Sequence, residues 1–281
     1  MQLIFFSKSL KDYSVDRLIR LGHELGIEGY DLCVRPGYLV EPDNVEKKLP
    51  PVVKQLRDED LAVPMVTGNF DLLWSDQPAA ELILSAMDQA DVRLLKLGYY
   101  QFTPGRDDYW TYVDRIRKSL QDWQKLGERY KVKVCYHTHS GLTMGVNCAA
   151  LAHLIRGFDP RFIGAYIDPG HMWIDGEPFS LGLAMIREYL SIVALKDSAY
   201  VGEREKEEGT YSPIFPPAGE GMVPWSSVFA ELVRTGYDGP LSIHAEFKKQ
   251  SHEEYLSAVK AEVLYFRQKR DIALAEVKIN P

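Results

Sequence analysis

Short apolar segments alternate with longer amphipathic segments along the whole 281-residue chain. The short segments have the length of buried strands, and the longer ones repeat apolar residues at helical spacing. The strands predicted in this way are Gln2–Phe6, Gly29–Cys33, Ala62–Val66, Arg93–Gly98, Lys131–His137, Ile163–Asp168, Ile192–Lys196 and Pro240–Glu246. The predicted helices are Val15–Leu25, Val45–Glu59, Ala79–Ala90, Tyr109–Tyr130, Cys148–Arg156, Phe179–Glu188, Ser226–Arg234 and Glu253–Lys269.

Strict alternation of strands and helices indicates βαβ units and a parallel sheet, which places the chain in the α/β class. Eight such repeats with no strand left over favour closure into a (β/α)8 TIM barrel. A barrel of this kind takes about 250 residues, so we expect residues 1–281 to form a single TIM-barrel domain. The pair Pro50-Pro51 is expected to break or restart the second helix.

One segment interrupts the regular spacing, a long polar loop from Ser198 to Pro224 (198–224) after the seventh strand. Loops that follow the strands of such a barrel lie on its active-site face, and loops of this length are usually functional. We therefore expect this loop to fold over the barrel mouth as a lid, with its charge run Glu203–Glu208 contributing to turnover. The alternative is a solvated decoration.

Charge and composition narrow the classes of partner. With 33 basic and 40 acidic residues the net charge is −7, which disfavours nucleic acid and weighs against a strongly anionic substrate. No apolar run approaches the roughly 20 residues of a membrane span, and the first residues lack the features of a signal peptide. The cysteines show no CxxC spacing and fit unpaired thiols in a reducing cytoplasm. We expect a cytoplasmic protein, and the sequence is compatible with a monomer or a homo-oligomer.

Histidines gather where chemistry is expected. Four of the seven lie at strand ends or in the turns just after them: His137, His139, His171 and His244. Because side chains alternate along a strand, His137 and His139 share one face, which we expect to point into the barrel. Two imidazoles at that position can bind a metal ion, or one can bind it while the other moves a proton. A hydrogen-bonded structural pair is the alternative.

Charged residues end the neighbouring strands. Asp168 closes an apolar strand, where an unpaired carboxylate is costly unless a cation lies beside it. Lys196 can neutralise an oxyanion or act as a base, and an ion pair with Asp197 or Asp168 is the alternative. Glu246 shares the inward face of its strand with His244. Further candidates for the site and its walls are Asp31, Asn69, Lys96, Tyr99, Tyr100, Phe102, Met172, Trp173 and Trp225.

These strand ends resemble the xylose isomerase-like TIM-barrel superfamily of sugar isomerases, epimerases and related lyases. The resemblance rests on the order and spacing of several segments: Asp168-Pro169-Gly170-His171, Leu195-Lys196-Asp197 and Gly236-Tyr237-Asp238-Gly239-Pro240-Leu241-Ser242-Ile243. The Tyr-His-x-His segment at Tyr136 looks more like the inosose dehydratase-type branch. The resemblance implies a small carbohydrate substrate and a divalent metal. It also implies that His171 contacts substrate, and we add Asp31, Asn69 and Trp173 to the predicted substrate-binding residues.

The chain departs from the family's usual metal set of Glu, Asp, His and Glu after strands five to eight. Only Asp168 matches that set, while His137, Ala194 and His244 stand at the other three places. The departures are compatible with a rebuilt site of His137, Asp168 and His244, helped by Glu246. Such ligands suit Mn, Fe, Co or Zn better than Mg. The other outcome is a weakened or absent metal.

Three functions follow from these residues. The first is a metal-dependent isomerase or epimerase that acts on a sugar or sugar-like polyol through an enediolate, with the base among Glu246, His139 and Lys196. The second is a lyase or dehydratase on a keto-sugar or keto-cyclitol, which shares the enolate. The third is a non-catalytic sugar-binding barrel or partner subunit, for which Ala194 is the best support.

Overall fold

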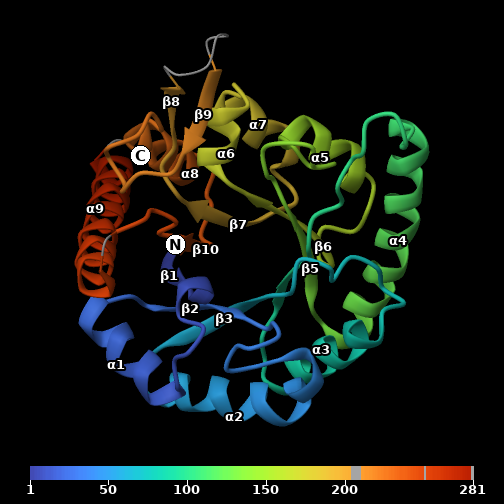
Figure 1. The fold of residues 1–281 in the computed structure, drawn as a ribbon, viewed down its shortest axis with the longest axis horizontal. Coiled ribbons are helices and arrows are strands. Elements are labelled where there is room, and N and C mark those ends of the chain that lie inside the picture. Colours follow the sequence, from blue (N-terminus) through green and yellow to red (C-terminus); the bar gives the residue numbers. More distant parts are fainter. Residues whose placement is uncertain (204–209, 250, 280–281) are drawn as a thin grey trace.

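The fold is a closed parallel barrel surrounded by helices (Figure 1). The computed structural model describes residues 1–203, 210–249 and 251–279. Its barrel strands are β1 (Gln2–Phe6), β2 (Gly29–Cys33), β3 (Ala62–Thr67), β4 (Leu94–Lys96), β5 (Lys133–His137), β6 (Ile163–Ile167), β7 (Leu190–Leu195) and β10 (Pro240–Ile243). The α-helices are α1 (Val15–Leu25), α2 (Val45–Asp58), α3 (Pro78–Gln89), α4 (Tyr109–Tyr130), α5 (Cys148–Ile155), α6 (Pro169–Ile174), α7 (Phe179–Ile186), α8 (Trp225–Arg234) and α9 (His252–Ile279).

The predicted TIM barrel is confirmed by the strand order. The strands are joined as β1-β10-β7-β6-β5-β4-β3-β2, and β1 closes the ring on β10 through the pairs Leu3–Leu241 and Phe5–Ile243. Because every neighbouring pair is parallel, the carboxyl ends of all eight strands meet at one mouth of the barrel. That mouth collects the side chains that follow each strand.

Apolar side chains fill the barrel on both sides of the sheet. A small cluster lies inside it and consists of Ile4, Met65, Cys135, Tyr166, Ile192 and Ala194. A much larger cluster lies between the sheet and the helices, where Tyr136 stacks on Tyr100 with ring centroids 5.3 Å apart. The inward direction of His137 follows, since Tyr136 takes the helix-facing side of β5.

The expected break at Pro50-Pro51 is wrong, because α2 continues through both prolines. Each proline removes one helical hydrogen bond, at a cost of up to about 3 kcal/mol. The apolar face of the helix, with Leu49, Val53 and Leu56, is buried against the barrel. This burial outweighs the local cost of the prolines, which the sequence pattern alone does not reveal.

Two elements after the strands were not predicted. The short helix α6 begins directly after β6, and the loop after β7 contains an antiparallel hairpin of β8 (Ala199–Glu203) and β9 (Thr210–Ile214). Figure 1 shows this hairpin beside α6 and α7 at the outer edge of the barrel. Most of the charge run Glu203–Glu208, which we expected to contribute to a lid, lies outside the described residues.

The described residues contain no helix that is both long enough and apolar enough to cross a membrane.

Candidate functional site

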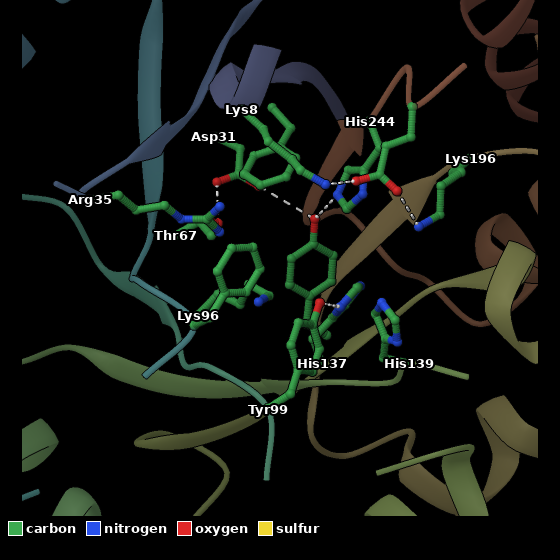
Figure 2. Close-up of a pocket in the computed structure, with 14 residues that line it drawn as sticks. Lys8, Asp31, Arg35, Thr67, Lys96, Tyr99, His137, His139, Lys196 and His244 are labelled. Atoms are coloured by element: carbon green, nitrogen blue, oxygen red, sulfur yellow. Dashed lines mark hydrogen bonds and ion pairs between the residues drawn. The ribbon is translucent and has the colours of Figure 1, made fainter. Parts of the chain in front are cut away.

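A pocket of about 440 Å³, including the part open to solvent, lies at the carboxyl mouth of the barrel. The ligand sites of TIM barrels lie at this end. The residues that line it are Phe6, Lys8, Asp31, Arg35, Thr67, Phe70, Lys96, Tyr99, His137, His139, Tyr166, Lys196, His244 and Glu246. Figure 2 shows Asp31, Arg35 and Lys96 on one side of it and His139, Lys196 and His244 on the other.

Lys196 is the centre of a buried charged cluster. Its ammonium lies 3.2 Å from Asp168 Oδ2, 2.9 Å from Glu246 Oε2 and 2.9 Å from His171 Nε2. Burial alone lowers the pKa of this lysine, but Asp168 and Glu246 more than reverse that effect and raise it. Lys196 is therefore a cation held between two carboxylates. The ion pair with Asp168 was one of the two arrangements that the sequence left open.

Local geometry places His171 over this lysine. Asp168 caps α6, because its Oδ1 accepts a hydrogen bond from the His171 amide at 3.1 Å. Gly170 makes the close approach to β7 feasible, since a Cβ atom there would lie 2.4 Å from the carbonyl oxygen of Lys196. The Asp-Pro-Gly-His sequence thus sets the distance between His171 and Lys196.

The imidazoles of the site are neutral. Burial and the Lys196 charge hold the pKa of His171 well below its usual value and lower that of His244 to about 3. Burial also holds the pKa of His137 well below its usual value. An ammonium can only donate, so His171 accepts through Nε2, and its Nδ1–H donates to Ser140 Oγ at 2.8 Å. The charges of this cluster therefore belong to lysine and carboxylates.

His139 lines the pocket, and among the described residues only its Nδ1 has a hydrogen-bond partner. Its Nδ1 lies 2.9 Å from the carbonyl oxygen of Ser140, which only accepts, so the ring hydrogen sits on Nδ1. The lone pair is then on Nε2. The His139 ring packs on that of His171, with centroids 4.0 Å apart, and burial lowers the pKa of His139 below its usual value. A neutral base therefore lies one ring away from the Lys196 cation.

Tyr166 lines the pocket, and its hydroxyl contacts both His244 and Asp31. Its hydroxyl lies 2.7 Å from His244 Nε2 and donates to Asp31 Oδ2 at 3.4 Å. Asp31 also accepts from Thr67 at 2.6 Å and Ser242 at 2.9 Å, and burial raises its pKa to about 6.

Glu246 joins two lysines at the pocket wall. It lies 2.9 Å from the Lys196 ammonium and 2.5 Å from that of Lys8. Burial alone raises the pKa of Glu246, but Lys196, His244 and Lys8 outweigh it and hold that pKa well below its usual value. A carboxylate in this state is a weak base.

These residues do not fit a divalent metal. His137 Nε2 and Asp168 Oδ2 face each other at 3.8 Å, but the Lys196 ammonium already lies against that oxygen. The third member of the predicted metal set, His244, directs its Nε2 to Tyr166 instead. Across residues 1–203, 210–249 and 251–279, no group of three or more His, Cys, Asp or Glu side chains is arranged to hold a metal ion. A metal here would have to displace a cation, which electrostatic repulsion opposes.

Ala194 explains part of this difference. It is fully buried in the apolar cluster inside the barrel, at the place where the family pattern has a histidine ligand. With no imidazole on that strand position, Lys196, two residues further along the same face, is the polar group that β7 supplies to the mouth.

Three of the four predicted substrate-binding residues do not line the pocket, and only Asp31 does: His171 is buried against Lys196, and Asn69 and Trp173 lie elsewhere. Asn69 donates to Asp71 at 2.9 Å and lines a separate surface depression. Trp173, on α6, is partly exposed and does not line the pocket.

Several lining residues were missed from the sequence: Phe6, Lys8, Arg35, Thr67, Phe70 and Tyr166. Lys8 and Arg35 follow β1 and β2 by two residues each, so a search of the positions just after every strand would have found both. No local signal marks Tyr166, whose contacts join β6 to β2 and β10.

The loop after β7 contributes one residue to the cluster. The Phe215 ring lies 5.3 Å from that of His171, and the Lys196 ammonium lies 4.4 Å from the Phe215 centroid. Buried Asp197 anchors the returning loop by accepting from the amides of Gly219, Gly221 and Val223. The loop thus contacts the charged cluster through Phe215, and its role as a lid stays a prediction.

The model of the family described as "Xylose isomerase-like TIM barrel" matches residues 19–267. The chain belongs to this family. By sequence it is similar to an inosose dehydratase of Bacillus velezensis, at 28% identity over 148 residues, which are 50% of this chain and 48% of that protein. The chain thus spans about half the length of the curated relatives it matches.

Solved structures of the family share the barrel at low identity. One is a 3-keto-D-glucoside 4-epimerase from E. coli, with a TM-score of 0.74 and 14% identity over 95% of this chain and 99% of that one. Another is a xylose isomerase-like TIM-barrel protein from Mycobacterium smegmatis in complex with magnesium, with a TM-score of 0.70 and 15% identity over 97% of each chain. At such identities the likeness concerns the fold alone.

Proposed function

We propose that this family member is an acid–base enzyme that dehydrates a keto-sugar or keto-cyclitol through an enolate, without a metal ion. One observation carries the proposal: the Lys196 cation and the neutral His139 base both contact His171 at the barrel mouth, Lys196 by a hydrogen bond and His139 by ring packing. Removal of a proton next to a carbonyl needs these two groups, a base for the carbon and a positive charge for the oxygen.

Lys196 supplies the charge for the enolate oxygen. Within the described part of the chain its polar contacts are with Asp168, His171 and Glu246, and of these three Glu246 is the partly exposed one, at 20%. A substrate oxygen that takes the place of Glu246 receives an N–H from a cation already held in position. Such preorganised charge in a dry site stabilises an oxyanion far more than the same charge does in water.

His139 moves the proton. Its Nε2 takes the hydrogen from the carbon next to the carbonyl while the C–H electron pair forms the enolate double bond. The imidazolium then gives that proton to the hydroxyl on the β-carbon. The C–O bond breaks, the enolate electrons form the carbon–carbon double bond, and water leaves. One residue thus serves both half-reactions on one face of the substrate, and no outside reactant is needed.

Sequence similarity to inosose dehydratases over half the chain supports dehydration over the isomerisation favoured by the sequence pattern. Epimerisation is the second candidate, because the barrel is shared with a 3-keto-D-glucoside 4-epimerase. It begins with the same enolate but returns the proton to the opposite face of the carbon. The two outcomes therefore differ only after the first step.

The test is incubation of the purified protein with a panel of keto-sugars and keto-cyclitols in D2O. We expect deuterium at the carbon next to the carbonyl in recovered substrate and, as product, a conjugated hydroxy-enone that tautomerises to a 1,2-diketone. We expect a rate unchanged by EDTA and far less than one metal per chain by elemental analysis. An epimer without an enone would support the second candidate. Activity that is lost on chelation and regained with one equivalent of metal would refute the metal-free reaction.

A further inference from the structure

Two buried cations lie on the side of the pocket opposite Lys196. Arg35 follows β2 and is 4% exposed, and Lys96 ends β4 and is 3% exposed. The Arg35 guanidinium lies 4.4 Å from the centroid of Phe70, and the Lys96 ammonium lies 4.0 Å from that of Tyr99. Figure 2 shows both side chains in the pocket close to Asp31. The rings of Phe70 and Tyr99, together with the strands, therefore hold the Arg35 and Lys96 side chains in place.

The charge of Asp31 acts on both cations, but Asp31 forms an ion pair with neither. Among the described residues no carboxylate forms an ion pair with Arg35 or Lys96. Arg35 Nε donates to the carbonyl of Gly68 and Lys96 Nζ to that of Leu97, each at 3.0 Å, and the Arg35 side chain also hydrogen-bonds that of Tyr38. Asp31 accepts instead from the hydroxyls of Thr67, Ser242 and Tyr166. Several N–H donors of the two cations are left for a ligand.

Such an arrangement is unfavourable in the free protein. Burying a charge without a partner is costly, and two like charges close together add to that cost. Consistent with this, burial and the neighbouring Arg35 lower the pKa of Lys96 to about 7. A bound anion would remove both costs, as the carboxylates of Asp168 and Glu246 do for Lys196.

We propose that Arg35 and Lys96 form a subsite for a carboxylate group of the substrate. The planar fork of arginine matches a carboxylate with two parallel hydrogen bonds, and lysine adds a third. The substrate would then be a carboxylated keto-sugar or keto-cyclitol, with its carboxylate on this side and its ketone at Lys196. This inference rests on the proposed function, since it assumes that the pocket holds the substrate of that reaction.

A carboxylate fits better than a phosphate. Phosphate sites of TIM barrels usually form after strands seven and eight, whereas Arg35 and Lys96 belong to β2 and β4. In the barrel order β2 and β4 flank β3, and β7 and β10 lie on the other side of the ring.

Binding without turnover tests the subsite. Calorimetry would compare D-glucuronate with D-glucose and D-gluconate with D-glucitol, each pair differing at the terminal carboxylate. We expect the acid to bind about tenfold or more tightly than its neutral partner, and the preference to disappear in Lys96→Met and Arg35→Gln. Lys8→Met is the matched control, because Lys8 lines the same pocket but is paired with Glu246, and it should keep the preference.

Three results would overturn the proposal: equal affinity within each pair, no binding of either acid, or a preference for glucose 6-phosphate over glucuronate. Reduction by borohydride that adds a keto-substrate to Lys96 would also overturn it, because an imine would assign this lysine a covalent role. None of these readouts depends on dehydration, so the subsite can fail while the proposed reaction stands, and the reverse also holds.

Stability of the ligand-free protein gives a second readout. If neither Arg35 nor Lys96 has an ion-pair partner in the ligand-free protein, Lys96→Met should raise its melting temperature by ~2 °C or more. Lys196→Met removes an equally buried but paired lysine and should lower it. A fall in the melting temperature of Lys96→Met would show that the ligand-free protein does not strain this site, which contradicts the proposal.

Discussion

Lys96 and Lys196 lie in one pocket, each 3% exposed, yet their surroundings differ. Lys196 lies between Asp168 and Glu246, which raise its pKa, whereas burial and Arg35 lower the pKa of Lys96 to about 7. Equal burial thus has opposite consequences, depending on whether a carboxylate is within reach. The comparison separates a part of the site that is complete in the free protein from a part that a ligand must complete.

The largest effect is expected when the paired lysine is removed. Lys196→Met leaves Asp168 fully buried without its cation, which should lower the free energy of unfolding by about 3–5 kcal/mol. It also removes the charge at the enolate oxygen, so kcat should fall by about 10²–10³-fold. Urea unfolding and steady-state kinetics measure the two effects. Lys96→Met is the control, and equal stability of the two variants would erase the contrast between the lysines.

The base on the paired side is expected to matter next. His139→Gln should lower kcat by about 10²-fold and slow exchange of the substrate hydrogen with D2O, because the variant lacks the nitrogen that takes the proton. Burial lowers the pKa of His139 below its usual 6.5, so the wild type keeps the base form near neutrality. Its kcat/KM should stay level above that pKa and fall as pH drops through it. If the kcat/KM of His139→Gln falls at the same low pH, a residue other than His139 is the base.

A smaller effect is expected at the acid that reaches Lys196 from the pocket wall. Glu246→Gln leaves Lys196 paired with Asp168, so we expect kcat to fall only about tenfold and hydrogen exchange to persist. Exchange measured in D2O decides the matter. If Glu246→Gln loses exchange completely while its fold stays intact, Glu246 is the base and His139 is not. Lys8→Met, which removes the other partner of Glu246, provides the comparison.

The smallest effect concerns how pH changes the unpaired side. The pKa of Lys96 is about 7 in the folded protein and 10.5 in the unfolded chain, so the unfolded chain binds more protons between these values. Wild-type stability should therefore rise with pH in this window, and the contribution is lost as pH falls through about 7. The charged or titratable groups that act on Lys96 are Arg35, Asp31, Cys33 and Lys8.

Lys96→Met should lack this rise, so the stabilities of the two proteins should differ by ~1 kcal/mol more at about pH 7 than at about pH 8. Urea unfolding at the two pH values measures it. Parallel pH profiles would mean that Lys96 is not strained in the free protein.

The sequence by itself determined the barrel. Strand and helix periods are local, and several predicted bounds, such as Gln2–Phe6 and Val15–Leu25, agree with the structure. Alternation also places His137 and Lys196 on inward faces at the mouth. Pro50-Pro51 misled the prediction because the burial that holds α2 together comes from the rest of the fold.

Only the tertiary structure decided which charges meet. The chain carries a net charge of −7, yet its pocket brings together Lys8, Arg35, Lys96 and Lys196 from four different strand ends. Total charge is a sum over the sequence, whereas the field in a pocket depends on distances between residues far apart in the chain. The same reason hid the pairing of Lys196 with Glu246, fifty residues away, and the lack of an ion-pair partner for Lys96 among the residues that the structure describes. These pairings follow from strand order around the barrel and not from any local pattern.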